Sequence, residues 1–354
     1  MPSAERRQKP TRRPARLWLR FPDEATACPW CASSRIRLLD VIAIPRDTKG
    51  RRVSFITGCD ECGLLFSNPP PTRDELERYY STEGPWAASH EERTKKIQVK
   101  DLSKIKKKEP PKQRAGRGAR DVLFDALAAY VPLRTAPPGA KVLDFGCGTG
   151  NKFLDKLQDW GWQTFGIEPS TRVAFLRHQR LDVPPQDGSF DFVILHHVLE
   201  HIAEPLSLLR QLAGSLRERG VLFLSVPRLD TLGQHRDLHY CINGRTHVVC
   251  FSESCLQSLL ARAGFAVTAR LDQLELDAAQ TDGKPLRLRL VATRTATPPP
   301  PSATPLAPAL NALRQYASAS RGLAQHFLKR LPVRVRAALM DRARERSRRL
   351  RAGQ

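Results

Sequence analysis

The central part of the chain alternates between short apolar runs and amphipathic stretches. Apolar runs of strand length occur at 141–145, 163–168, 187–195 and 221–226. Stretches with helical periodicity lie between or after them, at 151–160, 170–180, 206–216 and 256–263. Two more strands, at 266–271 and 285–293, would close the sheet as an antiparallel pair. This alternation predicts an α/β domain whose sheet is mostly parallel.

The first apolar run leads into a glycine-rich turn, in which residues 141–150 read K-V-L-D-F-G-C-G-T-G. Glycine accepts positive φ and allows a ligand to approach the backbone closely. The helix expected next would point its N-terminus at that ligand, as in nucleotide sites. The spacing is G-x-G-x-G, because Asn151 stands where the dinucleotide fingerprint needs a glycine.

Following V-L-D-x-G, this loop resembles the S-adenosylmethionine (SAM) loop of class I methyltransferases. The resemblance implies a Rossmann-like seven-stranded sheet and methyl transfer by direct displacement. It also assigns SAM contacts to Asp144, Gly146, Cys147, Gly148, Thr149 and Gly150. Glu168, 18 residues beyond Gly150 at the end of the next strand, can accept both ribose hydroxyls.

The segment after Glu168 is shorter than the family pattern. Only 19 residues separate Glu168 from Asp187, whereas a helix, a strand and their connections need roughly 25–30. We expect a helix at 170–180 and a stub of the third strand at 181–183, which Pro184 and Pro185 end. Asp182, or else Asp187, would contact adenine. If neither does, a non-catalytic protein on a degenerate fold is the alternative.

The fourth strand is followed by H-H-V-L-E-H, residues 196–201. A similar segment borders SAM in the family, so His196 is predicted to lie at the cofactor. His201 first, then His197, can accept a proton from the substrate, since histidine titrates near neutrality. His247 lies in a run similar to the family's substrate-side insertion and is the third candidate. The alternative is that these histidines only pack and form hydrogen bonds.

Two C-x-x-C motifs, Cys28–Cys31 and Cys59–Cys62, precede this domain. Their spacing predicts a zinc ribbon with a structural, four-thiolate Zn²⁺, and two unrelated thiol pairs are the alternative. Strands at 37–44 and 51–57 would join the motifs, and Thr72 with Glu75 predicts a capping box for a helix that ends at Tyr80. This block resembles the head of bacterial methyltransferases similar to enzymes of glycan and deoxysugar biosynthesis. A second metal site using His235, His239 and Cys241 or Cys250 has irregular spacing.

The formal charge of +22 is carried by the two flanks of the chain. Residues 1–120 hold 27 Lys and Arg against 15 Asp and Glu, residues 121–295 hold 19 of each, and residues 296–354 hold 12 against 2. The neutral centre favours a small-molecule acceptor, in line with the glycan-related family. The basic flanks favour RNA, which would make the chain an RNA methyltransferase, or an anionic surface; they can equally be solvated.

The predicted organisation has six parts: a disordered basic arm (1–25), the zinc ribbon with its helix (26–82), a basic linker (83–120), the methyltransferase domain (121–295), a Pro/Ala linker (296–309) and a basic helical tail (310–354). No stretch has the apolar length of a membrane span or a signal peptide. Four of the eight cysteines suit a metal better than disulfides. We therefore expect a cytoplasmic enzyme.

Overall fold

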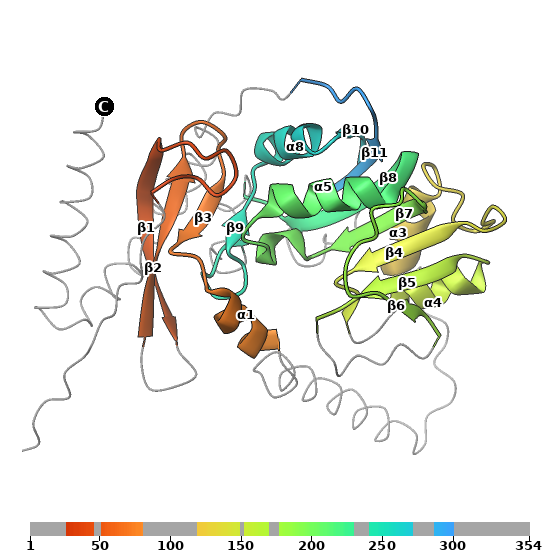
Figure 1. Ribbon diagram of the computed structural model, residues 1–354, viewed down its shortest axis with the longest axis horizontal. Coiled ribbons are helices and arrows are strands. Elements are labelled where there is room, and N and C mark those ends of the chain that lie inside the picture. Colours follow the sequence, from red (N-terminus) through yellow and green to blue (C-terminus); the bar gives the residue numbers. More distant parts are fainter. Residues whose placement is uncertain are drawn as a thin grey trace, which may run out of the picture.

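The structure is a computed structural model that describes seven stretches of the chain (Figure 1). These stretches are 26–45, 51–80, 119–148, 152–169, 177–229, 241–271 and 287–300. The predicted arm at 1–25, most of the linker at 83–120 and the tail at 310–354 lie outside them, as do Thr149, Gly150, His235 and His239. The described residues form two sheets, of seven and four strands.

The seven-stranded sheet confirms the expected methyltransferase architecture. Its order is β10 (Phe265–Arg270), β11 (Arg287–Arg294), β8 (Leu216–Pro227), β7 (Phe190–His196), β4 (Lys141–Phe145), β5 (Gln163–Ile167) and β6 (Gln179–Arg180). The strands from β8 to β6 pair in parallel, and β11 pairs antiparallel with both β8 and β10. The main sheet begins with β4 and adds later strands on both of its sides. The connections diverge at the carboxyl ends of β4 and β7, which is where open α/β sheets bind ligands.

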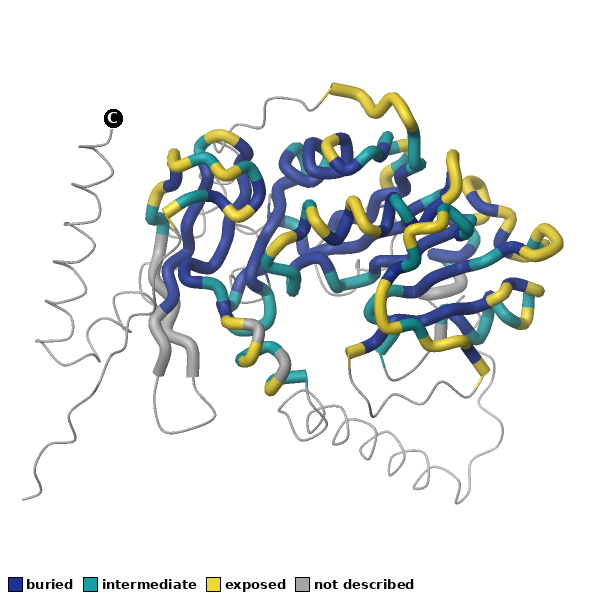
Figure 2. The backbone as a smooth tube through the Cα atoms, viewed as in Figure 1, coloured by how far each residue is buried: buried dark blue, intermediate teal, exposed yellow. Residues whose placement is uncertain are grey.

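Helices cover both faces of this sheet. Helices α5 (Pro205–Ser215) and α8 (Glu253–Arg262) bury leucines such as Leu209 and Leu259 against one face. Helices α3 (Ala119–Leu127) and α4 (Lys152–Asp159) bury Phe124 and Leu154 against the other. Figure 2 shows buried residues following the strands while the outer sides of the helices are exposed. Because the helices cover the two faces of the sheet, the carboxyl ends of its strands remain as the position for a ligand site.

The third strand is short, as expected, but its position differs from the prediction. Strand β6 has two residues, Gln179 and Arg180, rather than 181–183, and residues 177–180 are not helical. The buried His178 explains this, because its Nδ1 lies 2.8 Å from Thr164 Oγ1 and its Nε2 lies 3.1 Å from Asp155 Oδ1. These contacts hold the segment extended beside β5.

The fifth strand starts earlier than the apolar run suggested. Helix α5 ends at Ser215, and β8 begins at once with Leu216, which pairs with Phe190. Arg217 donates to Asp191, and Arg219 has a φ of 61°. The polar residues 217–219 thus belong to the strand, although the apolar run predicted a strand only from 221.

The second sheet joins the cysteine-rich head to the main domain. It contains β1 (Ile36–Pro45), β2 (Arg51–Cys59), β3 (Leu65–Asn68) and β9 (Val249–Cys250), in that order. Strands β1 and β2 confirm the predicted hairpin. Strand β9 comes from the main domain and pairs antiparallel with β3. One apolar core runs through both sheets, since Trp30 and Phe66 of the head belong to the same cluster as Phe251 and Leu256.

Helix α1 (Arg73–Tyr80) leaves the head and runs toward the main domain. The predicted capping box is confirmed: the Thr72 N–H donates to Glu75 Oε2 at 2.9 Å, and the Glu75 N–H donates to Thr72 Oγ1 at 3.2 Å. At its other end, Tyr79 lies under the Arg245 guanidinium, 4.8 Å from the ring centroid. Within the described residues, no helix is both long and apolar enough to cross a membrane.

Candidate active site and metal centre

The glycine loop and the acid after β5 form one unit at the carboxyl edge of the sheet. The Gly146 N–H donates to the Ile167 carbonyl at 2.7 Å, and the Gly148 N–H donates to Glu168 Oε2 at 3.0 Å. Both glycines have positive φ, 75° and 64°. The loop therefore carries Glu168 at its rim, as the SAM resemblance predicted.

The space around the two glycines differs in a way that fits a ligand. A Cβ at Gly146 would lie 2.5 Å from Val198 Cγ2, so this glycine lets the segment after β7 approach the loop. A Cβ at Gly148 would meet no atom of the described residues within 4 Å, so they leave this side of the loop open. A positive-φ turn with an open side and a carboxylate at its rim fits a nucleoside with free hydroxyls.

Asp144 and Glu168 are two buried carboxyl groups at this loop, 4% and 6% exposed. Burial, and then the charge of Glu168, raises the pKa of Asp144 to about 7. A negative charge on Asp144 would be costly in this buried position beside Glu168. Asp144 therefore holds its proton more tightly than an aspartate in water does. Glu168 therefore remains the residue that we expect to accept ribose hydroxyls.

Of the two acids predicted to contact adenine, only Asp182 lies at the same end of the sheet as the glycine loop. Asp187 Oδ1 accepts the Ser189 N–H in the turn before β7, at the amino end of the strands, so it faces away from the loop. Asp182 follows β6 at the carboxyl end and is exposed. His196 ends β7 and lies against the Phe153 ring of α4 at 5.4 Å. Asp182 and His196 are compatible with a place beside the cofactor.

The three candidate catalytic histidines come together after β7. His197 Nδ1 lies 3.0 Å from Glu200 Oε1, and the His201 and His247 rings are perpendicular with centroids 4.7 Å apart. The Val248 N–H donates to the Glu200 carbonyl at 2.8 Å, which holds the two segments together. His197 has a φ of 57°, an uncommon value for a residue with a side chain. Glu200, in the short helix η2 (Leu199–His201), has no exposed surface.

Sequence reasoning missed Tyr80, the last residue of α1. Its hydroxyl oxygen lies 3.0 Å from His201 Nδ1. Burial, then the neighbouring Tyr79, raises the pKa of Tyr80, and burial lowers the pKa of His201 to about 4. Both groups are therefore neutral at pH 7. The only available signal was the aromatic pair at the helix end, because 121 residues separate the two partners.

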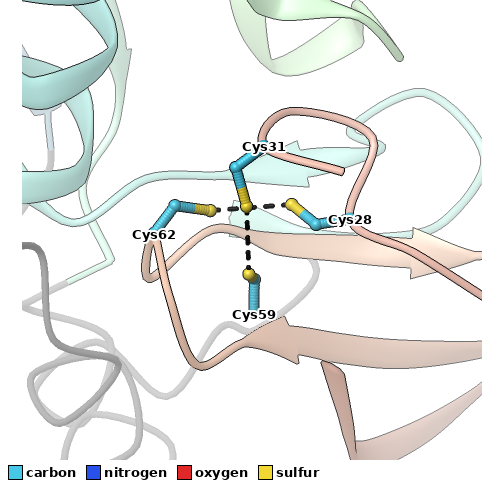
Figure 3. Close-up of side chains that lie close together, drawn as sticks. All are labelled: Cys28, Cys31, Cys59 and Cys62. Atoms are coloured by element: carbon cyan, nitrogen blue, oxygen red, sulfur yellow. Dashed lines mark hydrogen bonds between the residues drawn. The ribbon is translucent and has the colours of Figure 1, made fainter. Parts of the chain in front are cut away.

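The four head cysteines converge as their spacing predicted (Figure 3). The Sγ atoms of Cys28 and Cys62 are 3.6 Å apart, those of Cys31 and Cys59 are 3.5 Å apart, and all four lie within 4.8 Å of one another. Four sulfur donors around one point fit tetrahedral Zn²⁺ and leave no position for a substrate. The cluster lies at the base of the β1–β2 hairpin, where it can stabilise the head.

Comparison with known proteins agrees with this geometry. A family profile described as "Methyltransferase domain" matches residues 115–270. The ubiquinone biosynthesis O-methyltransferase of Xanthomonas campestris pv. campestris (strain B100) is 36% identical over 112 residues, covering 27% of this chain and 46% of that protein. An uncharacterized 37.1 kDa protein in transposon TN4556 of Streptomyces fradiae is 29% identical over 134 residues, covering 33% of this chain and 37% of its own length. The chain thus spans less than half of these curated relatives.

Among solved structures, a SAM-dependent methyltransferase from Mesorhizobium loti aligns with 50% of this chain and 100% of its own, at 19% identity and a TM-score of 0.39. The family profile covers β4 to β10, which includes the glycine loop and the histidine cluster. The profile therefore matches the central domain of the chain to a methyltransferase domain, and the loop, the acid at the end of β5 and the strand order agree with the class I SAM-dependent fold.

Proposed function

We propose that the protein transfers a methyl group from SAM to a hydroxyl of a small-molecule acceptor. The observation that carries the proposal is the buried Glu200, which faces His197 at hydrogen-bond distance directly after β7. When bound, SAM supplies an electrophilic methyl group. The chain then has to orient the acceptor, exclude water and take up the proton of the hydroxyl.

We favour His197 as the base, ahead of His201. Glu200 can hold the Nδ1–H of His197, which leaves its Nε2 to accept the proton and lets the carboxylate stabilise the resulting cation. His201 is less suited, because burial lowers its pKa to about 4 and Tyr80 contacts its Nδ1. His201, Tyr80 and His247 would then shape the acceptor side.

The acceptor class is the finer part of the proposal. Similarity of the head to glycan and deoxysugar enzymes supports a sugar or nucleotide-sugar, and the ubiquinone O-methyltransferases among the relatives support a phenol as second choice. The choice of an oxygen as accepting atom is supported by the O-methyltransferases among the relatives. The head would carry a structural Zn²⁺ on Cys28, Cys31, Cys59 and Cys62.

The test is a transfer assay with full-length, zinc-loaded protein and radiolabelled SAM. The acceptor panel contains nucleotide-sugars, phenols and bulk RNA, the last because the flanks are basic. We expect transfer to one small-molecule class, and His197→Gln to lower kcat by about 10²–10⁴-fold, the contribution of a general base. SAM affinity should stay within twofold. Transfer to RNA alone, or full activity of His197→Gln, would contradict the proposal.

A further inference from the structure

We infer that Glu200, His201 and His247 form a second metal site, for a divalent first-row cation, separate from the cysteine cluster. One carboxylate oxygen of Glu200 and one ring nitrogen from each histidine lie within 4.8 Å of one another. Glu200 and His201 belong to one segment, and His247 belongs to another. The Val248 N–H donates to the Glu200 carbonyl and so holds the two segments together. The backbone therefore brings the donors together without the ion.

A second observation points to a cation independently of this spacing. Glu200 has no exposed surface, and its Oε1 faces His197 Nδ1. Its Oε2 is also buried and has no hydrogen-bond partner among the residues that the structure describes. Buried polar atoms nearly always have a partner, and a carboxylate oxygen that lacks one is costly. A metal ion beside two imidazoles would give this oxygen a direct, positively charged partner.

The donor set also indicates which ion would bind. Two imidazoles and one carboxylate suit Mn²⁺, Fe²⁺ or Zn²⁺, whereas four thiolates suit Zn²⁺ but not Mn²⁺. The surroundings resemble the outer shell of a metal site, since Tyr80 contacts one nitrogen of His201 and His197 contacts the other oxygen of Glu200. Three protein ligands leave coordination positions for an acceptor oxygen.

The alternative is a network without metal. A protonated Glu200 would remove the buried charge, and burial does raise the pKa of this carboxyl. His201 would then be held by Tyr80 and by its hydrogen bond with the Thr246 backbone. The two accounts differ in one measurable property, which is affinity for a hard divalent ion.

The role of the ion rests on the proposed function, but its binding does not. Next to the acceptor, a cation would hold an acceptor with two neighbouring oxygens and make its hydroxyl more acidic. The hydroxyl proton would pass to His197, the oxygen would bond to the methyl carbon, and the bond from that carbon to the sulfonium sulfur would break. This predicts acceptors with adjacent oxygen donors.

The experiment is a Mn²⁺ titration of the full-length, zinc-loaded chain, followed by electron paramagnetic resonance. Mn²⁺ prefers oxygen and nitrogen over thiolate, so it reports on this site rather than on the cysteines. We expect one bound Mn²⁺ with imidazole nitrogen coupling in the spin-echo spectrum. Glu200→Gln and His247→Ala should each weaken binding at least about tenfold. Glu204→Gln, an exposed acid four residues from Glu200, is the matched control and should change the affinity less than twofold.

Absence of bound Mn²⁺ in the wild-type chain, or a bound ion without nitrogen coupling, would overturn the inference. So would unchanged affinity in folded Glu200→Gln, a variant that keeps the shape of the side chain in case His247→Ala does not fold. SAM binding is measured on the same samples. Mn²⁺ binding without SAM binding would contradict the proposed function but leave the metal site, and the reverse result would do the opposite.

Discussion

The cysteine cluster of the head and the Glu200–His201–His247 cluster are assembled in different ways. Each pair of cysteines is three residues apart at one end of a hairpin, so the β1–β2 register alone brings the four sulfurs together. The second cluster depends on the contact between η2 and the segment before β9, and on Tyr80 from a third place in the chain. The first kind of site is local and closed, whereas the second is built by tertiary contacts.

The comparison also shows that the two clusters are linked. Strand β3 begins three residues after Cys62 and pairs with β9, which begins two residues after His247. Helix α1 continues from β3 and carries Tyr80 to His201. A change in the head can therefore affect the proposed acceptor side in two ways, through the pairing of β3 with β9 and through helix α1. We expect the head to complete the acceptor site as well as to stabilise the fold.

The largest effect should come from Cys59→Ser, which breaks the closed cluster. Structural zinc in small domains contributes about 10–16 kcal/mol of binding free energy, and this energy holds the fold. We expect hydrogen exchange in β1 to β3 to become fast. Methyl transfer should fall at least about 100-fold, at about 1.4 kcal/mol of activation free energy for each factor of ten. SAM affinity should persist. Cys241→Ser changes a buried cysteine outside the cluster and should keep activity; normal transfer by Cys59→Ser would refute the link.

The next largest effect should be a pH dependence of stability caused by Asp144. This residue belongs to the glycine-loop motif, and the folded chain buries its carboxyl group. Its pKa is raised from 3.8 to about 7, so the folded state binds the proton more tightly than the unfolded state. Stability from this group is complete below pH 4 and is lost as the pH rises through 7. Between pH 5 and pH 7.5, wild type should lose on the order of 2 kcal/mol relative to Asp144→Asn. Urea unfolding at both pH values measures this, and parallel pH profiles would contradict it.

The smallest effect should come from Tyr80→Phe, which removes one hydroxyl from the second cluster and keeps the ring. Loss of one hydrogen bond costs about 0.5–1.5 kcal/mol of stability. We expect kcat to fall by up to about tenfold, with SAM affinity unchanged. Tyr79→Phe is the control on the neighbouring ring. Equal kcat values for both variants would show that Tyr80 only packs.

What could be predicted from the sequence follows the same division. The C-x-x-C pairs, the capping box at Thr72 and the glycines before Cys147 and Thr149 are short motifs, and the described part of each has the local geometry that its motif predicts. The β3–β9 pair and the Tyr80–His201 contact join segments more than 100 residues apart and leave no periodic signal. The position of β6 was wrong by two residues because the buried His178, rather than an apolar run, holds this strand.

The measurement that tests the central claim most directly is a calorimetric titration of SAM into the zinc-loaded, full-length chain, with Gly148→Arg as the matched control. Gly148 has a φ of 64° and, among the described residues, no neighbour within 4 Å of a Cβ. An arginine would therefore strain the turn and fill the place that we expect the cofactor to take. We predict one SAM bound per chain, with affinity reduced at least about 100-fold in the variant, a loss of roughly 2.7 kcal/mol. Absence of binding, or equal binding by a folded variant, would contradict the assignment of this loop to SAM.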